Sequence, residues 1–308
     1  MTTRDPAPPL AGQIITVRVS PLERMVHRVT PFLFLVPALA LVGILLIWPF
    51  VRSSYLSFTE FNGLGTPKWV GLDNYRQLFH DPAISQSMKN TAYWVIGTMI
   101  LPVGIGLLIA VLSFDQRGGS MLRLPFLLPY ALSGTAIATV WQFLLSKNGA
   151  INSVLGAVGL ESLERSWLLR PPVNTWAMIV ASTWQAVGVS VLLFLIGLQV
   201  IPKDPIEAAR LDGAEGFRLF WDMTLPMLRP MTIVTVGISL VNSLKTFDIV
   251  WIMTQGGPAR TSETLAVTMY RETFVIRHHG YGASISVVLS VFVLAVSMLY
   301  LTRTLKAN

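Results

Sequence analysis

The sequence predicts an all-α protein that crosses a membrane several times. Hydrophobic residues make up 53% of the 308-residue chain and charged residues only 13%, whereas a soluble domain carries roughly 25% charged residues. The charges are also unevenly spaced, so that long stretches of the chain contain none. Several of these stretches reach the roughly 20 apolar residues that a helix needs to cross a bilayer.

Five uncharged stretches are long enough to be spans, and the one between Arg170 and Lys203 exceeds a single span. A sixth stretch, after Pro230, is apolar except for Lys245 and Asp248. A buried helix of a soluble core is the alternative there, but the position between two spans favours a sixth span. We therefore expect a polytopic membrane protein with six transmembrane helices, at about 30–52, 91–114, 124–146, 175–199, 230–254 and 281–303.

The two ends of the chain are expected on the same side of the membrane, because the number of spans is even. Residues 1–29 are predicted to be a disordered cytoplasmic tail, and residues 30–305 a single transmembrane domain. If that side is the cytoplasm, 12 of the 23 lysines and arginines lie there and 10 lie opposite. This bias has the direction expected for cytoplasmic loops but is small, so charge alone does not determine the orientation.

The loop between the fourth and fifth spans carries the clearest local signals. Asp204 is expected to cap a short helix, with Pro205 at its first position and Glu207 at its third, as in a capping box. Gly213 can end that helix in the left-handed conformation, and a second short helix is expected over 214–224. From these residues alone, a hairpin lying on the membrane surface is as good an interpretation as a docking site.

This loop resembles the EAA loop of ABC-importer permeases. The matching residues are Glu207-Ala208-Ala209, Asp212-Gly213-Ala214, Phe220, Leu225-Pro226 and Pro230. The resemblance implies the type I importer permease architecture, with residues 202–230 as a cytoplasmic loop that docks into a separate ATP-binding subunit. It also implies that Glu207 pairs with a basic residue of that subunit. The residues expected to couple the two subunits are Glu207, Ala208, Ala209, Asp212, Gly213, Ala214, Phe217 and Phe220.

Three further segments resemble the sugar-transporting branch of that family. They are residues 70–75, residues 149–152 with Leu155, and Phe247-Asp248 with residues 254–258. The resemblance covers roughly residues 30–305. It implies a di- or oligosaccharide importer of the bacterial inner membrane, with a second similar permease subunit, two ATP-binding subunits and an extracytoplasmic substrate-binding protein. An importer of glycerol 3-phosphate or another polyol phosphate is an alternative, and a secondary transporter is an alternative of another class.

Several functions are disfavoured by what the sequence lacks. It has no G-x-x-x-x-G-K-[ST] phosphate loop, so ATP and Mg²⁺ are expected only on the partner ATPase. Cysteine is absent and the four histidines show no metal-ligand spacing, so we expect no metal or cofactor in this chain. An intramembrane enzyme is a further alternative, but no nucleophile–base cluster supports it. Gly104-Ile105-Gly106 lies inside a span and is interpreted as close helix packing.

Polar and aromatic residues inside the fourth and fifth spans are candidates for the substrate pathway. By resemblance, Trp184 and Ser182 line a sugar site, where an indole can stack on the C–H face of a sugar ring. An interfacial anchor is the alternative for Trp184. Lys245 and Asp248 are three residues apart and either neutralise each other or face the pathway. The expected pathway residues are Ser182, Trp184, Asn242, Ser243, Lys245, Thr246 and Asp248.

Overall fold

The structure, a computed structural model, describes residues 21–306 and consists almost entirely of helices. Within that range the only strands are β1 (Thr59–Glu60) and β2 (Lys68–Trp69), which pair antiparallel. The all-α prediction is therefore confirmed. The chain divides into two units, Met1–Arg52 and Ser53–Asn308, which are described separately.

The first unit contains α1 (Pro21–Val42), the π-helical turn η1 (Gly43–Ile47) and the start of α2 (Trp48–Leu56). Phe34–Leu56 is long and apolar enough to cross a membrane. Of the tail expected to be disordered, residues 1–20 lie outside the described residues. For residues 21–29 the prediction is wrong, because Pro21 starts a helix that continues into the apolar run. Proline suits a first helical position, where no backbone N–H is needed.

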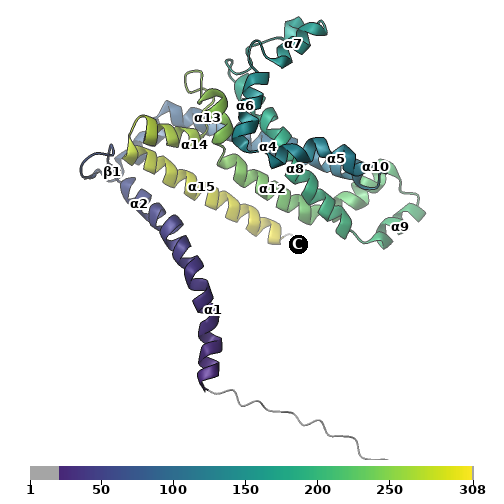
Figure 1. The fold of residues 1–308 in the computed structure, drawn as a ribbon, viewed down its shortest axis with the longest axis horizontal. Coiled ribbons are helices and arrows are strands. Elements are labelled where there is room, and N and C mark those ends of the chain that lie inside the picture. The colour runs from purple at the N-terminus through teal and green to yellow at the C-terminus, as the bar shows by residue number, and fades with distance from the viewer. Residues whose placement is uncertain (1–20, 307–308) are drawn as a thin grey trace, which may run out of the picture. The chain divides into compact units, whose positions relative to one another are not determined.

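The second unit holds the remaining helices, which differ widely in length (Figure 1). They are α3 (Asp73–His80), α4 (Pro82–Phe114), α5 (Gly119–Leu127), η2 (Leu128–Ala131), α6 (Gly134–Leu144), α7 (Ala150–Ala157), η3 (Glu161–Leu163), α8 (Val173–Val200), α9 (Lys203–Leu211), α10 (Gly216–Leu219), η4 (Phe220–Thr224), α11 (Leu225–Met227), α12 (Arg229–Leu244), α13 (Asp248–Thr254), α14 (Leu265–Tyr270), η5 (Arg271–Val275) and α15 (His279–Lys306).

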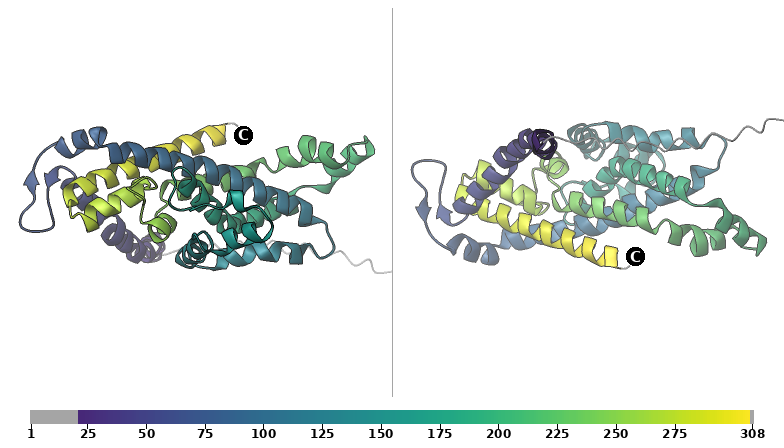
Figure 2. Two further views of the ribbon diagram at one scale, coloured as in Figure 1. Left: turned by 90° about the horizontal axis from the view of Figure 1, so that it is seen from above. Right: turned by 90° about the horizontal axis from the view of Figure 1, so that it is seen from below.

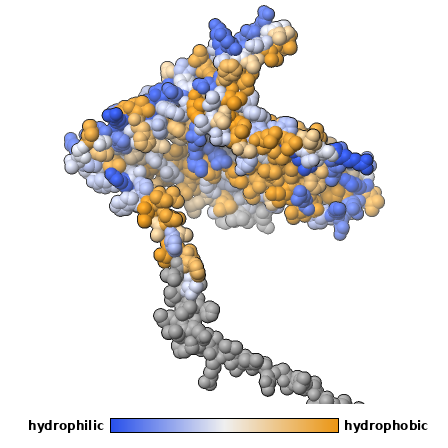
Figure 3. All heavy atoms as spheres, in the orientation of Figure 1, coloured by the Kyte–Doolittle hydropathy of each residue, from blue (hydrophilic) through white to orange (hydrophobic). Residues whose placement is uncertain are grey.

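The described chain has four helices that could each cross a membrane, and up to six spans if each of two bent helix pairs counts as one. The second unit contributes Pro82–Phe114, Val173–Val200 and His279–Thr304, together with both bent pairs. Figure 3 shows apolar side chains over much of the visible face of this unit, with hydrophilic ones gathered at its ends, around α7 and around α9 and α10. This distribution suits a protein whose middle faces lipid.

The core of the second unit is built on α4, which runs along its length and packs against α8 (Figure 2). Glycines allow the two helices to approach closely. A Cβ atom at Gly97 would lie 2.6 Å from Cγ2 of Ile179, and one at Gly106 would lie 2.4 Å from Cβ of Ser190. Close packing is thus found at Gly106, whereas a Cβ at Gly104 would have no neighbour within 4 Å. Small residues at such a crossing are typical of membrane helix pairs.

The third expected span, 124–146, is not one straight helix. Gly119–Ala131 and Gly134–Leu144 meet at an angle of 106°. Pro129 lies in the 3₁₀ turn before the bend, Leu132 is extended, and the Ser133 side chain caps α6 by accepting from the N–H of Ala136. Proline cannot donate to the preceding turn, so the helix ends here and restarts in a new direction.

The fifth expected span, 230–254, is also interrupted. Helix α12 ends at Leu244, and α13 starts only at Asp248. The backbone N–H groups of Lys245 and Thr246 bond to carbonyls three residues back, at Asn242 and Ser243. These tight turns end the helix without a proline or glycine, so no local signal for the break was present in the sequence. At its other end α12 follows Gly216–Met227 at an angle of 70°.

Candidate substrate cavity and coupling loop

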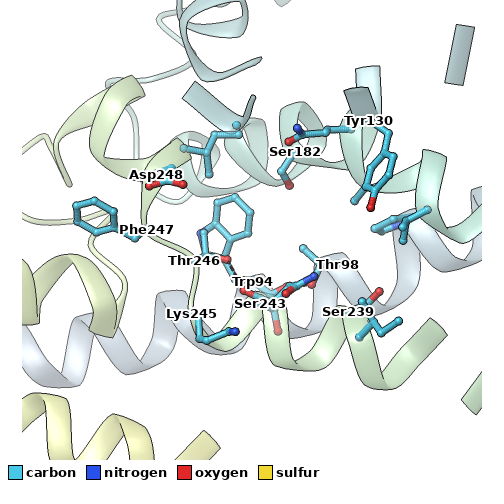
Figure 4. Close-up of a pocket in the computed structure, with 18 residues that line it drawn as sticks. Trp94, Thr98, Tyr130, Ser182, Ser239, Ser243, Lys245, Thr246, Phe247 and Asp248 are labelled. Atoms are coloured by element: carbon cyan, nitrogen blue, oxygen red, sulfur yellow. Dashed lines mark hydrogen bonds between the residues drawn. The ribbon is translucent and has the colours of Figure 1, made fainter. Parts of the chain in front are cut away.

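A cavity of about 470 Å³ lies between α4, α8, α12 and the start of α13 (Figure 4). Its wall combines aromatic, aliphatic, hydroxyl, amide and charged side chains. The lining residues are Trp94, Thr98, Pro102, Tyr130, Gly134, Ser182, Gln185, Ala186, Val189, Ile238, Ser239, Asn242, Ser243, Lys245, Thr246, Phe247, Asp248 and Ile249. Such a mixture of apolar surface with a few convergent polar groups is characteristic of small-molecule sites.

Six of the seven expected pathway residues line this cavity, and Trp184 does not. Helix geometry explains the difference, because Ser182, Gln185 and Val189 recur at the spacing of one helix face, while Trp184 lies 200° around from Ser182. The indole of Trp184 instead meets that of Trp141 on α6 edge to face, with ring centroids 6.1 Å apart. The role of Trp184 in the pathway therefore stays a prediction.

Trp94 is one of the lining residues that the sequence did not predict. It lies on α4, is only 1% exposed, and its indole N–H has no acceptor in the described part of the chain. Thr98, one turn further along α4, lines the same cavity and donates to the Trp94 carbonyl. The spacing of these two residues inside an uncharged span was the available signal, but nothing in the sequence placed that face of α4 beside α12.

Several hydroxyl groups of the cavity, those of Thr98, Ser182 and Ser243 among them, donate to carbonyls of their own helices. Ser182 Oγ donates to Ile179 O at 2.8 Å, and Ser243 Oγ donates to Leu240 O at 2.7 Å. Gln185 Nε2 donates to Leu132 O at 2.7 Å and so ties α8 to the bend before α6. Each hydroxyl oxygen keeps lone pairs that can accept from a ligand.

Lys245 and Asp248 lie on either side of the helix break rather than within one helix, so their expected placement at helical spacing is wrong. Both side chains are exposed and both line the cavity. No ion pair joins them in the part of the chain that the structure describes. The carboxylate of Asp248 faces the start of α6, where a Cβ at Gly134 would lie 3.9 Å from Oδ2. The cavity wall thus carries one cation and one anion that form no ion pair with any other residue that the structure describes.

The coupling loop folds as two short helical segments joined by a bend at Gly213. Helix α9 begins at Lys203 after Pro202, and Asp204 makes no side-chain cap, so the predicted capping box is wrong. The end of α9 agrees with the prediction, since Gly213 has φ +83°. The Ala214 N–H bonds to Ala209 O at 2.9 Å and the Gly213 N–H to Arg210 O at 3.0 Å, the two bonds of a Schellman motif.

The second helical segment differs in extent from the expected 214–224. It runs as α10, η4 and α11 from Gly216 to Met227, so it begins two residues later and ends three residues later than expected, with Pro226 inside it. Phe217 is 75% exposed and stacks on Trp221, with centroids 5.8 Å apart, and Phe220 lies 6.4 Å from Phe217. These three side chains form an aromatic cluster on the surface.

A groove of about 650 Å³ lies between the C-terminal ends of α4 and α8 and the helices of the loop. Glu207 lines it together with Lys203 and Arg210. Among residues 21–306, no ion pair involves the Glu207 carboxylate. Ala208, Asp212 and Gly213 are exposed, and Ala209 and Ala214 half-buried. The loop therefore presents small side chains, a free carboxylate and exposed aromatic rings side by side.

Residues 102–307 match the family model described as the binding-protein-dependent transport system inner membrane component. A probable ABC transporter permease protein of Pyrococcus horikoshii is 35% identical over 279 residues, covering 90% of this chain and 96% of that protein. The sulfoquinovosyl glycerol transport system permease protein of Agrobacterium fabrum is 33% identical over 281 residues, covering 89% and 90%. The chain belongs to this family of ABC-importer permeases.

The fold agrees with that membership. A chain in the crystal structure of a bacterial ABC transporter involved in the import of the acidic polysaccharide alginate superposes with a TM-score of 0.81. The match covers 93% of this chain and 99% of that chain at 19% sequence identity. The multi-pass permease fold expected from the sequence is thus confirmed.

Proposed function

We propose that this chain forms half of the translocation pathway of an ATP-driven importer for di- or oligosaccharides. The observation that carries the proposal is the cavity between α4, α8 and α12, whose wall combines aromatic rings with hydroxyl and amide groups. Sugars need both kinds of surface, since their ring faces are apolar and their edges carry hydroxyl groups. The named relative that transports sulfoquinovosyl glycerol supports a carbohydrate-like substrate.

Within this proposal, Ser182, Asn242, Ser243 and Thr246 hydrogen-bond substrate hydroxyl groups from α8 and α12. Lys245 and Asp248 supply a donor and an acceptor at the helix break. Trp184 is 36% exposed, and its open face would contribute to the part of the pathway that a second, similar permease subunit completes.

The coupling loop would dock into an ATP-binding subunit on the cytoplasmic side, so that both termini of this chain are cytoplasmic. Glu207 would pair with a basic residue of that subunit, and the aromatic cluster of Phe217, Phe220 and Trp221 would bury its exposed faces in the contact. Support comes from the Glu207 carboxylate, which forms no ion pair among residues 21–306, and from the exposed rings of Phe217 and Trp221. ATP hydrolysis would take place on the two ATP-binding subunits, and an extracytoplasmic binding protein would deliver the substrate.

The test is reconstitution of this chain in liposomes with its partner subunits and binding protein. The binding protein is first titrated by calorimetry with a panel of disaccharides, oligosaccharides and glycerol 3-phosphate, and the best ligand is then used for uptake. We expect ATP-dependent uptake of a di- or oligosaccharide. Uptake that is independent of ATP, or that is confined to glycerol 3-phosphate, would refute the proposal.

A further inference from the structure

A buried charge network lies beside the cavity, in the segment that connects α13 to α15. The Glu263 side chain is 0% exposed. Its carboxylate accepts from Arg260 Nε at 3.0 Å, from Thr268 Oγ1 at 2.7 Å and from Arg271 Nε. Arg260 also lies 3.1 Å from Glu272. Two carboxylates and two guanidinium groups therefore neutralise one another within a single cluster.

The carboxylates of the network stabilise the charged form of Arg260. Burial by itself would lower the pKa of Arg260, but the charges of Glu263 and Glu272 outweigh burial and raise that pKa. Charged pairs removed from water are costly to break because the partner left behind is buried without compensation. The cluster thus joins the turn that holds Arg260 and Glu263 to the helical segments α14 and η5, which carry Thr268, Arg271 and Glu272.

The same segment is fastened to α4, the helix that carries the cavity residues Trp94 and Thr98. Asn90 Nδ2 donates to the carbonyls of Thr261 and Glu263, both at 2.8 Å. Because Asn90, Trp94 and Thr98 are four residues apart, they lie along one face of α4. The two hydrogen bonds of Asn90 therefore hold the network in a defined position relative to the face of α4 that lines the cavity.

Two contacts connect the network to the helix break, whose residues also line the cavity. Thr264, next to Glu263, donates from Oγ1 to the carbonyl of Thr246 at 2.7 Å and also caps α14. Arg271 bonds to Gln255 O and lies over the Trp251 ring, 5.6 Å from its centroid. Trp251 in turn stacks on Phe247, which lines the cavity, with centroids 5.9 Å apart.

We propose that Glu263 is a positioning residue for the transport pathway. By holding Arg260 and Arg271, it fixes the segment 261–265, and through Thr264 this segment fixes the break at residues 245–247. The conformation of that break places Lys245, Thr246 and Phe247 in the cavity wall. The inference rests on the proposed function of the cavity, but the geometry that it predicts can be measured without any transport assay.

The experiment uses the fact that the chain has no cysteine. Thr246→Cys reports on the break, and Val189→Cys is the matched control, since Val189 lies in the same cavity wall but on α8, a helix that carries none of the residues of the network. Each is combined with Glu263→Gln, which keeps the size of the side chain and removes its charge. The assembled transporter with its partner subunits is labelled with a membrane-impermeant maleimide, and the labelling rate is measured.

We expect Glu263→Gln to change the labelling rate at Thr246→Cys by about 2- to 10-fold. This is the change in an equilibrium that follows from losing one hydrogen bond of ordinary net strength, here the bond from Thr264 to the carbonyl of residue 246. The rate at Val189→Cys should stay the same. An equal change at both positions would indicate general loosening of the fold, and no change at Thr246→Cys would show that Glu263 does not position the break. Either result overturns the proposal.

A second pair of variants covers the case in which Glu263→Gln does not assemble. Thr264→Val removes the hydroxyl group that holds the Thr246 carbonyl, whereas Thr264→Ser keeps it. Thr264→Val should alter labelling at Thr246→Cys, and Thr264→Ser should restore the wild-type rate. If both Thr264 variants label like the wild type, the connection from the network to the break does not exist, whatever the outcome for sugar transport.

Discussion

Substitution of Gly213 tests the coupling loop most directly. Gly213 has φ +83°, and a Cβ atom there would meet nothing within 4 Å. A substitution therefore causes no clash, and its whole cost is backbone strain of about 1–2 kcal/mol for an L-residue in the left-handed region. Leaving that region would break the Schellman bonds of Ala214 and Gly213, each worth about 0.5–1.5 kcal/mol net.

These two costs are similar, so the outcome should depend on the side chain. Asparagine tolerates the left-handed conformation, and Gly213→Asn should transport nearly as well as the wild type. Gly213→Ala should give a mixture of molecules with the bend formed and molecules with the bend opened. Valine, whose branched Cβ restricts the backbone further, should open the bend. A change of about 1.4 kcal/mol corresponds to a tenfold loss of the docked conformation.

The assay is substrate transported per ATP hydrolysed, together with the amount of ATP-binding subunit that co-purifies. Gly65→Val is the matched control, because Gly65 also has positive φ (+74°) and no neighbour within 4 Å of an added Cβ, but lies between β1 and β2. Equal coupling in Gly213→Val and the wild type would refute the reasoning. So would an equal loss in Gly65→Val, since strain anywhere in the chain would then suffice.

The remaining predictions concern docking, the pathway and topology. Glu207→Lys should abolish co-purification of the ATP-binding subunit, since reversing a buried docking charge costs about 3–5 kcal/mol; undiminished co-purification would exclude that contact. Trp184→Ala should lower uptake per assembled complex about tenfold, if stacking contributes roughly 1–3 kcal/mol as for nucleobases, and unchanged uptake would remove Trp184 from the pathway. Trp94→Phe keeps a ring but loses the indole N–H and should weaken apparent substrate affinity in the same assay; equal affinity would show that this N–H does not contact substrate. Tags at Asn308 and near Gly65 should be labelled from the cytoplasmic and the outer side respectively, because five spans are expected between them; labelling of both from one side would mean an even number of spans and would contradict the topology.

The location of the helices along the chain could be predicted from the sequence, because a bilayer penalises charge at any depth. The stretches between charged residues therefore contain all of α8 and most of α4 and α15. The bend at Gly213 could also be predicted, because the left-handed conformation depends on the residue itself rather than on its neighbours. The predicted cap at Asp204 is not found, because a cap depends on the path of the preceding chain, and α9 starts at Lys203, two residues before the expected Pro205.

Tertiary structure decided which side chains meet. The break after Leu244 has no glycine or proline, and its Thr246 carbonyl is bonded by Thr264, 18 residues further along the chain. Trp94 joined the cavity and Trp184 did not, because the crossing of α4 and α8 selects which face of each helix turns inward. A helix alone presents every face equally. The packing partners of a helix determine which of its residues line a site. The relative placement of helices that are distant in the chain cannot be read from the local patterns of a single sequence.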